Sequence, residues 1–244
     1  MDPRLRGDDR SIMMNPKDRL IIALDLPSAE DAQAAIDAIG DEGVFYKIGY
    51  QLMPIGGLDL AKRLSDAGKK VFLDFKFHDI GATVERGVKS VATFGGDFLT
   101  VHAEPDVLKG AVDGRGDDTR LKILGVTVLT SLNQASLTHM GIDIALPDLV
   151  LKRAEFAAEA GANGVVASAK EAAAIKARFG DALTIVTPGV RPAGSDANDQ
   201  KRVVTPADAI IAGADHLVVG RPIIAAKDPK SAARAIQDEI ARAL

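Results

Sequence analysis

The sequence predicts an α/β protein, specifically a single-domain (β/α)₈ TIM barrel, and three features carry that prediction. Eight apolar runs are spaced along the 244 residues, alanine-rich stretches with helical spacing separate them, and several of those stretches end in glycine. The apolar runs lack the half-polar alternation of a one-sided sheet, which indicates parallel strands covered on both faces. An open doubly wound sheet is the alternative that this pattern leaves standing.

The expected elements follow in a regular order. The eight strands are residues 20–26, 44–50, 70–77, 98–103, 121–129, 164–168, 183–190 and 216–220. Helical spacing is clearest in residues 28–39 and 147–160, where Ser28 suits an N-cap and Pro147 a first helical turn. Glycine ends four helical stretches, because it accepts a left-handed conformation without a Cβ clash. These terminators are Gly68, the pair Gly95 and Gly96, Gly161 and Gly213.

Composition limits the class of protein. Apolar residues make up 47% of the chain and charged residues 26%, as in a globular protein with a large core. The net charge of −4, without a dense Lys/Arg cluster, argues against nucleic acid as a partner. No apolar run approaches the roughly 18 residues of a membrane span, and the absence of cysteine excludes disulfides and thiolate chemistry. We expect a soluble, cytoplasmic protein with no membrane partner.

The domain organisation is expected to be simple. Residues 1–14 are polar and lack the apolar middle of a signal peptide, so we expect a flexible N-terminal extension there. Residues 15–244 contain no Pro/Gly/Ser-rich linker and no shift in composition. They are expected to form one barrel domain.

Polar side chains recur where the expected strands end. In such barrels the carboxyl ends of the strands meet at one face, where active sites form. The residues at those ends are Asp25, Lys47, Asp74, Lys76, His102, Thr130, Ser131, Arg191, Gly220 and Arg221. Single residues have simpler explanations: Asp25 suits a helix cap, Lys47 a lysine extending from the rim, and His102 a structural imidazole. Charges after four successive strands nevertheless favour a shared site.

A phosphate-binding site is predicted near the end of the chain. Gly220 and Arg221 follow the last strand, where glycine lets the backbone approach an anion and arginine forms charge-assisted hydrogen bonds. The preceding loop, residues 188–206, is long and polar and contains Arg191 and Gln200. Loops of this length in compact barrels are commonly functional, so we expect a lid over a phosphorylated small molecule. A structural arginine at the rim is the alternative for Arg221.

The third expected strand carries the most informative charges. The segment VFLDFKFHD places Asp74 and Lys76 on one face and Asp79 just beyond. A buried ion-pair network would explain them, but such networks are costly and replaceable by apolar packing. Neighbouring carboxylates favour the cationic form of a lysine, which can stabilise a carbanion and protonate it. A fixed aspartate would also repel an anionic substrate group until that group leaves as CO₂, so the segment favours a decarboxylase over a hydrolase.

No metal centre is expected from the histidines. The chain has four of them, His78, His102, His139 and His216, and they show neither HxH nor HExxH spacing. No serine nucleophile paired with a base is evident either.

Seven segments, in order, resemble orotidine 5′-monophosphate decarboxylases of the bacterial type. They are ALD, YKIG, FLDFKFHDI, VTVLTS, TPGVRP, DQKRVVTP and VVGRPI, and they extend from about residue 20 to the last helix. Together they are specific, although DxKxxD alone is shared with other members of the barrel superfamily. The resemblance implies decarboxylation of orotidine 5′-monophosphate to uridine 5′-monophosphate in pyrimidine biosynthesis, with no metal or organic cofactor.

The resemblance also assigns roles. Lys76 matches the proton donor to C6 of the pyrimidine, Asp74 the aspartate facing the substrate carboxylate, and Asp79 an aspartate contributed across a homodimer interface. The remaining matches concern substrate binding. Asp25 and Lys47 match residues that bond the ribose hydroxyls, and Lys47 also belongs to the charged array. Thr130 and Ser131 match contacts near the base, Ile80 and Thr83 match further substrate contacts, and the phosphate contacts are Arg191, Gln200, Gly220 and Arg221.

Two segments depart from the resemblance, and two other functions stay open. HDIGAT has Gly81 and Ala82 where many bacterial relatives have proline and asparagine, and Thr100 stands where asparagine is frequent. Neither change touches a charged position.

The two alternative functions are a Mg²⁺-dependent sugar-phosphate lyase of the same superfamily, such as 3-keto-gulonate-phosphate decarboxylase or hexulose-phosphate synthase, and a non-catalytic nucleotide-binding barrel.

Overall fold

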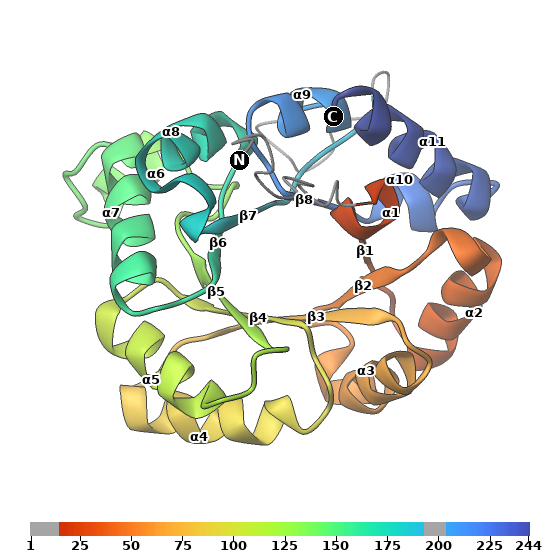
Figure 1. Ribbon diagram of the computed structural model, residues 1–244, viewed down its shortest axis with the longest axis horizontal. Helices are drawn as coiled ribbons and strands as arrows, with labels where there is room; N and C mark the ends of the chain where they lie inside the picture. The colour runs from red at the N-terminus through yellow and green to blue at the C-terminus, as the bar shows by residue number, and fades with distance from the viewer. Residues whose placement is uncertain (1–14, 193–203) are drawn as a thin grey trace, which may run out of the picture.

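The computed structural model describes residues 15–192 and 204–244, which form a closed barrel of eight parallel strands. The strands are β1 (Leu20–Ala23), β2 (Phe45–Ile48), β3 (Lys70–Phe77), β4 (Phe98–His102), β5 (Lys122–Val126), β6 (Gly164–Val166), β7 (Thr184–Thr187) and β8 (His216–Val219). Each strand pairs with the next and β8 pairs with β1, so Figure 1 shows an inner ring of strands inside a ring of helices. The predicted barrel is confirmed, and the open doubly wound alternative is wrong.

Helices connect the strands on the outside of the barrel. They are α1 (Pro16–Arg19), α2 (Ala29–Ile39), α3 (Gly57–Asp66), α4 (Gly81–Ala92), α5 (Pro105–Arg115), α6 (Gln134–His139), α7 (Leu146–Glu159), α8 (Ala169–Phe179), α9 (Pro206–Ile211), α10 (Arg221–Ile224) and α11 (Pro229–Arg242). Three 3₁₀ turns accompany them: η1 (Gly40–Glu42), η2 (Met53–Ile55) and η3 (Gly180–Ala182). Within the described ranges, no helix has the length and apolar character required to cross a membrane.

Local signals in the sequence account for several helix boundaries. The Ser28 hydroxyl accepts a hydrogen bond from the Asp31 amide at 3.0 Å, so α2 starts with the predicted N-cap. Positive φ angles confirm four of the predicted glycine terminators, Gly68, Gly95, Gly161 and Gly213. The N-terminal extension predicted for residues 1–14 lies outside the described residues.

Each strand lies inside the range predicted for it, and β3 has the predicted bounds. The predicted ranges mostly overran at the carboxyl ends, as at residues 127–129 after β5. There the apolar sequence continues, but the chain leaves the sheet, and Val128 and Leu129 line a cavity at the mouth of the barrel. Hydrophobicity alone does not distinguish a buried strand from a buried loop that follows it.

Aromatic residues fill the inside of the barrel below that mouth. Phe45, Phe72 and Phe98 are buried and belong to a separate interior cluster, distinct from the larger core between the sheet and the helices. The Phe45 and Phe98 rings meet edge to face at 5.1 Å between centroids, and Phe72 meets Phe98 at 5.9 Å. The interior is therefore a packed floor, and functional groups sit above it.

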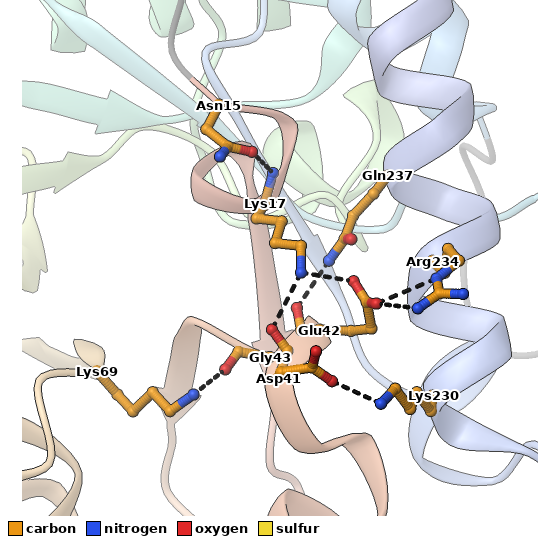
Figure 2. A network of polar contacts seen from close by, with 9 residues as sticks. All are labelled: Asn15, Lys17, Asp41, Glu42, Gly43, Lys69, Lys230, Arg234 and Gln237. Atoms are coloured by element: carbon orange, nitrogen blue, oxygen red, sulfur yellow. Dashed lines mark hydrogen bonds and ion pairs between the residues drawn. The ribbon is translucent and has the colours of Figure 1, made fainter.

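A polar network, drawn in Figure 2, lies at the opposite end of the barrel, where β1 and β2 begin. Glu42, in η1, is buried, and its carboxylate lies 2.8 Å from Lys17 Nζ and 2.5 Å from Arg234 Nη2. Gln237 donates to the Glu42 carbonyl oxygen at 2.8 Å. The network joins α1, η1 and α11, segments far apart in the chain.

Replacing Glu42 by glutamine should destabilise the fold by about 1–2 kcal/mol, because two cations lose a buried anionic partner. Hydrogen bonds from Lys17 and Arg234 hold the pKa of Glu42 below its usual value, although burial raises it. A lowered pKa means that this contribution is present at neutral pH and is lost as the pH falls through that pKa. Denaturant unfolding of both proteins at neutral and acidic pH would measure the difference.

The matched control for Glu42→Gln is Asp41→Asn. Asp41 forms its ion pair with Lys230 at 2.6 Å, but its side chain is 72% exposed. Exposed pairs contribute little, so this variant should change the unfolding free energy much less. Equal effects of the two variants would contradict the structural role of Glu42.

Candidate active site

A chain of alternating charges crosses the carboxyl ends of the first three strands. Lys47 Nζ lies 2.9 Å from Asp25 Oδ1 and 3.4 Å from Asp74 Oδ2. Lys76 Nζ lies 2.7 Å from Asp74 Oδ1. The predicted Asp25, Lys47, Asp74 and Lys76 are therefore one connected array, in which Asp74 stands between two ammonium groups.

The two lysines and Asp74 are mostly shielded from water, whereas the Asp25 side chain is 52% exposed. Lys47 is 7% exposed, so its ammonium does not extend into solvent. Burial alone would raise the pKa of Asp74, but the charges of Lys47 and Lys76, with hydrogen bonds from Lys76 and Thr100, keep it below its usual value. Asp74 therefore keeps its negative charge at neutral pH.

Lys76 reaches this position through an irregular strand. The β3–β4 pairing shifts register between Leu73 and Phe77, and Lys76 itself has a φ of 44°. A left-handed conformation at a non-glycine residue costs about 1–3 kcal/mol and persists where surrounding contacts hold it. The Tyr50 ring lies 5.5 Å from the Lys76 ammonium, a contact that sequence reasoning missed.

A polar cavity of about 490 Å³ opens beside the array. Its lining includes seven of the residues expected at the strand ends: Asp25, Lys47, Asp74, Lys76, Arg191, Gly220 and Arg221. It also includes Gly49, where a Cβ would lie 2.9 Å from Lys47 Nζ and 3.2 Å from Asp25 Oδ1. Glycine at this position leaves room for that ion pair.

Two arginines meet in the polar cavity. Arg191 is buried, and burial and the like charge of Arg221 lower its pKa. Its Nη1 donates to the Val190 carbonyl at 3.0 Å, but its buried Nε has no hydrogen-bond partner among the described residues. Two guanidinium groups that line one cavity favour an anionic ligand, and a phosphate would suit their donors.

A second, more apolar cavity of about 330 Å³ adjoins the first. The two share Lys47, Asp74, Lys76, Pro188 and Val218. The second is lined by Phe72, Val126, Val128, Leu129 and Val166, and the predicted Thr130 and Ser131 stand at its edge. The charged array thus lies between an arginine-lined cavity and a more apolar cavity with two hydroxyls. This arrangement suits an elongated ligand with an anionic end and a less polar end.

Three described residues to which the resemblance gives a role lie outside these cavities. Asp79, Ile80 and Thr83, which follow β3 and begin α4, line neither cavity of their own chain. Asp79 instead accepts a hydrogen bond from the Ile80 amide at 2.7 Å, and Ile80 is 71% exposed. Gln200 lies outside the described residues.

The unusual HDIGAT segment has a structural explanation at Gly81. A Cβ at this position would lie 2.8 Å from the carbonyl oxygen of Asp106, at the start of α5. Helices α4 and α5 approach each other closely there, since a Cβ on Gly110 would in turn lie 2.3 Å from the Gly81 carbonyl oxygen. Any side chain at residue 81, proline included, would require the two helices to move apart.

His78, His102 and Glu104 form the one group of described residues that could hold a metal ion, with donor atoms within 4.8 Å of one another. Sequence spacing gave no sign of it, because the contact joins the ends of β3 and β4. These side chains already have protein partners: His78 Nε2 lies 3.1 Å from Glu104 Oε1, and the two imidazoles stack at 4.5 Å between centroids. His102 therefore fits the structural alternative given above.

Comparison with known proteins adds an independent observation. Residues 18–236 match the model of the family described as "Orotidine 5′-phosphate decarboxylase / HUMPS family". Among curated proteins, orotidine 5′-phosphate decarboxylase of Bradyrhizobium diazoefficiens is 55% identical over 229 residues, covering 94% of this chain and 96% of that protein. The protein of the same name from Rhodopseudomonas palustris strain BisA53 is 57% identical, covering 92% of this chain and 95% of the relative.

Solved structures agree with the sequence matches. A crystal structure of orotidine 5′-phosphate decarboxylase from Lactobacillus acidophilus superposes with a TM-score of 0.80 at 37% identity, covering 91% of this chain and 98% of that one. An uncharacterized conserved protein from Geobacillus kaustophilus superposes with a TM-score of 0.78 at 32% identity, covering 91% and 99%. The similarity therefore extends over the whole barrel and both cavities.

Proposed function

The chain belongs to the orotidine 5′-phosphate decarboxylase / HUMPS family, and from this premise we propose that it converts orotidine 5′-monophosphate to uridine 5′-monophosphate and CO₂ in pyrimidine biosynthesis. The observation that carries the proposal is the Lys47–Asp74–Lys76 array between an arginine-lined cavity and an apolar one. The enzyme acts in the cytoplasm and needs no metal or organic cofactor.

The proposed chemistry uses the charges of β3 directly. The substrate carboxylate is held beside ionised Asp74, and their repulsion is relieved when the bond from C6 to the carboxyl carbon breaks. The electron pair of that bond stays on C6, where the Lys76 ammonium stabilises it and then transfers a proton to it. Lys76 recovers its proton from solvent, so the net reaction consumes one proton and releases neutral CO₂.

The rest of the substrate occupies the two cavities. The phosphate lies at Arg191, Gly220 and Arg221, joined by Gln200, and the ribose hydroxyls bond to Asp25 and Lys47. The pyrimidine enters the apolar cavity beside Thr130 and Ser131. Binding energy from the remote phosphate is used to hold the carboxylate against Asp74, so it appears in the rate rather than in tight substrate binding.

The active unit is a homodimer in which each chain completes the other's site. Asp79, Ile80 and Thr83 line neither cavity of their own chain, yet they directly follow the strand that carries Lys76. A two-fold interface at this rim would place them at the partner's cavity and would cover the exposed Ile80. Asp79 then becomes the second carboxylate beside Lys76.

The Mg²⁺-dependent lyases of the superfamily are a poorer match to the charges of this site. A divalent cation at Asp74 would meet the ammonium of Lys47 on one side and that of Lys76 on the other. These cations satisfy the carboxylate and repel a metal. The family description covers both kinds of enzyme, but relatives 55–57% identical to this chain carry the name of the nucleotide decarboxylase.

A decarboxylation assay in EDTA tests the proposed function. We expect the purified protein to consume orotidine 5′-monophosphate, followed by the loss of its absorbance, at the same rate with and without chelator. Activity that disappears in EDTA and returns with Mg²⁺ would favour a metal-dependent lyase. No consumption under either condition would reject the nucleotide decarboxylase and leave the two alternatives, a lyase that acts on a sugar phosphate and a nucleotide-binding barrel without catalysis.

The phosphate site has its own test in Arg221→Ala. Loss of a charge-assisted hydrogen bond should lower kcat/KM for the nucleotide by about 10- to 100-fold. Turnover of the bare nucleoside orotidine, already slow, should change little, because it offers this arginine no anion. Parallel kinetics on both substrates measure the effect, and equal losses would contradict a phosphate role for Arg221.

A further inference from the structure

One buried hydroxyl contacts both Asp74 and Lys76 of β3. Thr100, in the middle of β4, has no exposed surface, and it lines neither cavity. Its Oγ1 accepts a hydrogen bond from the Lys76 backbone amide at 3.0 Å and donates one to Asp74 Oδ1 at 3.0 Å. A threonine hydroxyl can do both at once, since it has one donor and two acceptor sites.

This contact lies where the sheet is irregular. Leu73 pairs with Leu99 and Phe77 with Val101, so four residue steps of β3 face two of β4. The extra residues form a bulge that takes the Lys76 amide out of the regular ladder. Among the described residues, Lys76 is also the only non-glycine residue with a positive φ.

A buried amide that leaves a ladder needs another acceptor, and here the acceptor is a side chain. Thr100 therefore replaces the strand carbonyl that would otherwise receive the Lys76 N–H. The same oxygen orients the Asp74 carboxylate, whose Oδ1 also accepts from Lys76 Nζ at 2.7 Å. The Lys76 backbone and the Asp74 carboxylate thus bond to one hydroxyl, and the Lys76 ammonium is joined to that hydroxyl through Asp74 Oδ1.

We propose that Thr100 is a positioning residue, which holds the left-handed backbone of Lys76 and the carboxylate of Asp74 in the geometry needed for decarboxylation and protonation. The inference rests on the proposed function. Thr100 does not touch the substrate, so it acts only through these two residues. Its effect belongs to the chemical step and not to nucleotide binding, because the arginines at the phosphate site lie elsewhere.

The test compares substitutions that differ by single groups. Thr100→Val keeps the branched shape and removes the hydroxyl, and it should lower kcat by roughly 10- to 100-fold while KM changes little. Thr100→Ser keeps the hydroxyl and should retain most of the activity. Thr127→Val is the matched control: Thr127 is equally buried, and its hydroxyl donates to the Val166 carbonyl, away from the array. If Thr100→Val does not fold, Thr100→Ala against Thr100→Ser repeats the comparison.

Wild-type kcat in the Thr100 variant without a hydroxyl would overturn the proposal. An equal loss of kcat in Thr100→Ser, or in Thr127→Val, would do the same, because the loss would then reflect packing. A second readout needs no substrate: hydrogen exchange of the Lys76 amide, followed by NMR, should accelerate at least about tenfold without the hydroxyl and stay near wild type in Thr100→Ser. If exchange is faster in the variant without the hydroxyl but the wild-type protein releases no CO₂, the proposed function is rejected and the structural role of Thr100 is kept.

Discussion

Substituting Lys76 by alanine is expected to reduce turnover of orotidine 5′-monophosphate by about a thousandfold or more, because it removes both the proton donor and the cation that stabilises the carbanion. Binding of uridine 5′-monophosphate should stay within a few-fold of wild type, because Arg191 and Arg221, which hold the phosphate, are unchanged. Steady-state kinetics and calorimetry measure the two quantities. Near-normal turnover would reject the mechanism.

Lys76→Arg separates the two roles of this residue. Arginine keeps a cation beside Asp74, but it holds its proton far more tightly than lysine does. If proton delivery is the essential step, Lys76→Arg should be nearly as inactive as Lys76→Ala. If turnover returns with arginine, electrostatic stabilisation carries the rate and the proton comes from elsewhere. Asp74 keeps Lys47 and Thr100 as partners in both variants, so both should fold.

The location of the site followed from the sequence, because the rule that decides it is topological. Parallel strands of a closed barrel bring their carboxyl ends to one face, so Asp25, Lys47 and Asp74 had to lie near one another once the strands were identified. Their ion pairs, at 2.9 and 3.4 Å, join residues that are 22 and 27 positions apart. No spacing rule was needed beyond the order of the strands.

The contacts that hold the charged residues of the site in place could not be predicted from the sequence. Simple alternation placed Asp74 and Lys76 on the same face, but the structure reaches this result through a bulge and a left-handed Lys76. Bulges depend on the pairing of two strands and have no signature in either one alone. For the same reason the sequence marked Thr100 only as an unusual residue, and its two hydrogen bonds became apparent only once β3 and β4 were side by side.

The histidines show that spacing along the chain can also miss a cluster of side chains. Spacing along the chain argued against any group of metal-binding residues, yet His78 and His102 stack, with Glu104 beside them. Motifs such as HxH detect ligands on one strand or one helix. Neighbouring strands of a barrel bring residues from different segments together, so local spacing neither predicts nor excludes such a cluster.

Mixing two inactive variants should restore activity if Asp79 serves the partner's site. Asp79→Ala alone is expected to lose about a hundredfold or more in kcat, because Lys76 loses one of its two flanking carboxylates. When Asp79→Ala and Lys76→Ala chains are co-expressed in equal amounts, half of the dimers are mixed. Each mixed dimer has one site with both residues intact, so about a quarter of wild-type activity should return.

The control for this experiment is co-expression of Lys76→Ala with Asp74→Ala. Asp74 and Lys76 belong to the same strand and contact each other at 2.7 Å, so no exchange of chains can unite an intact pair in one site. This mixture should stay inactive. Recovery in the first mixture and not in the second would assign Asp79 to the neighbouring site, whereas no recovery in either would return it to its own chain, where its contact is the Ile80 amide. The charged face of β3 would then be a site within one chain, and the dimer would have no part in catalysis.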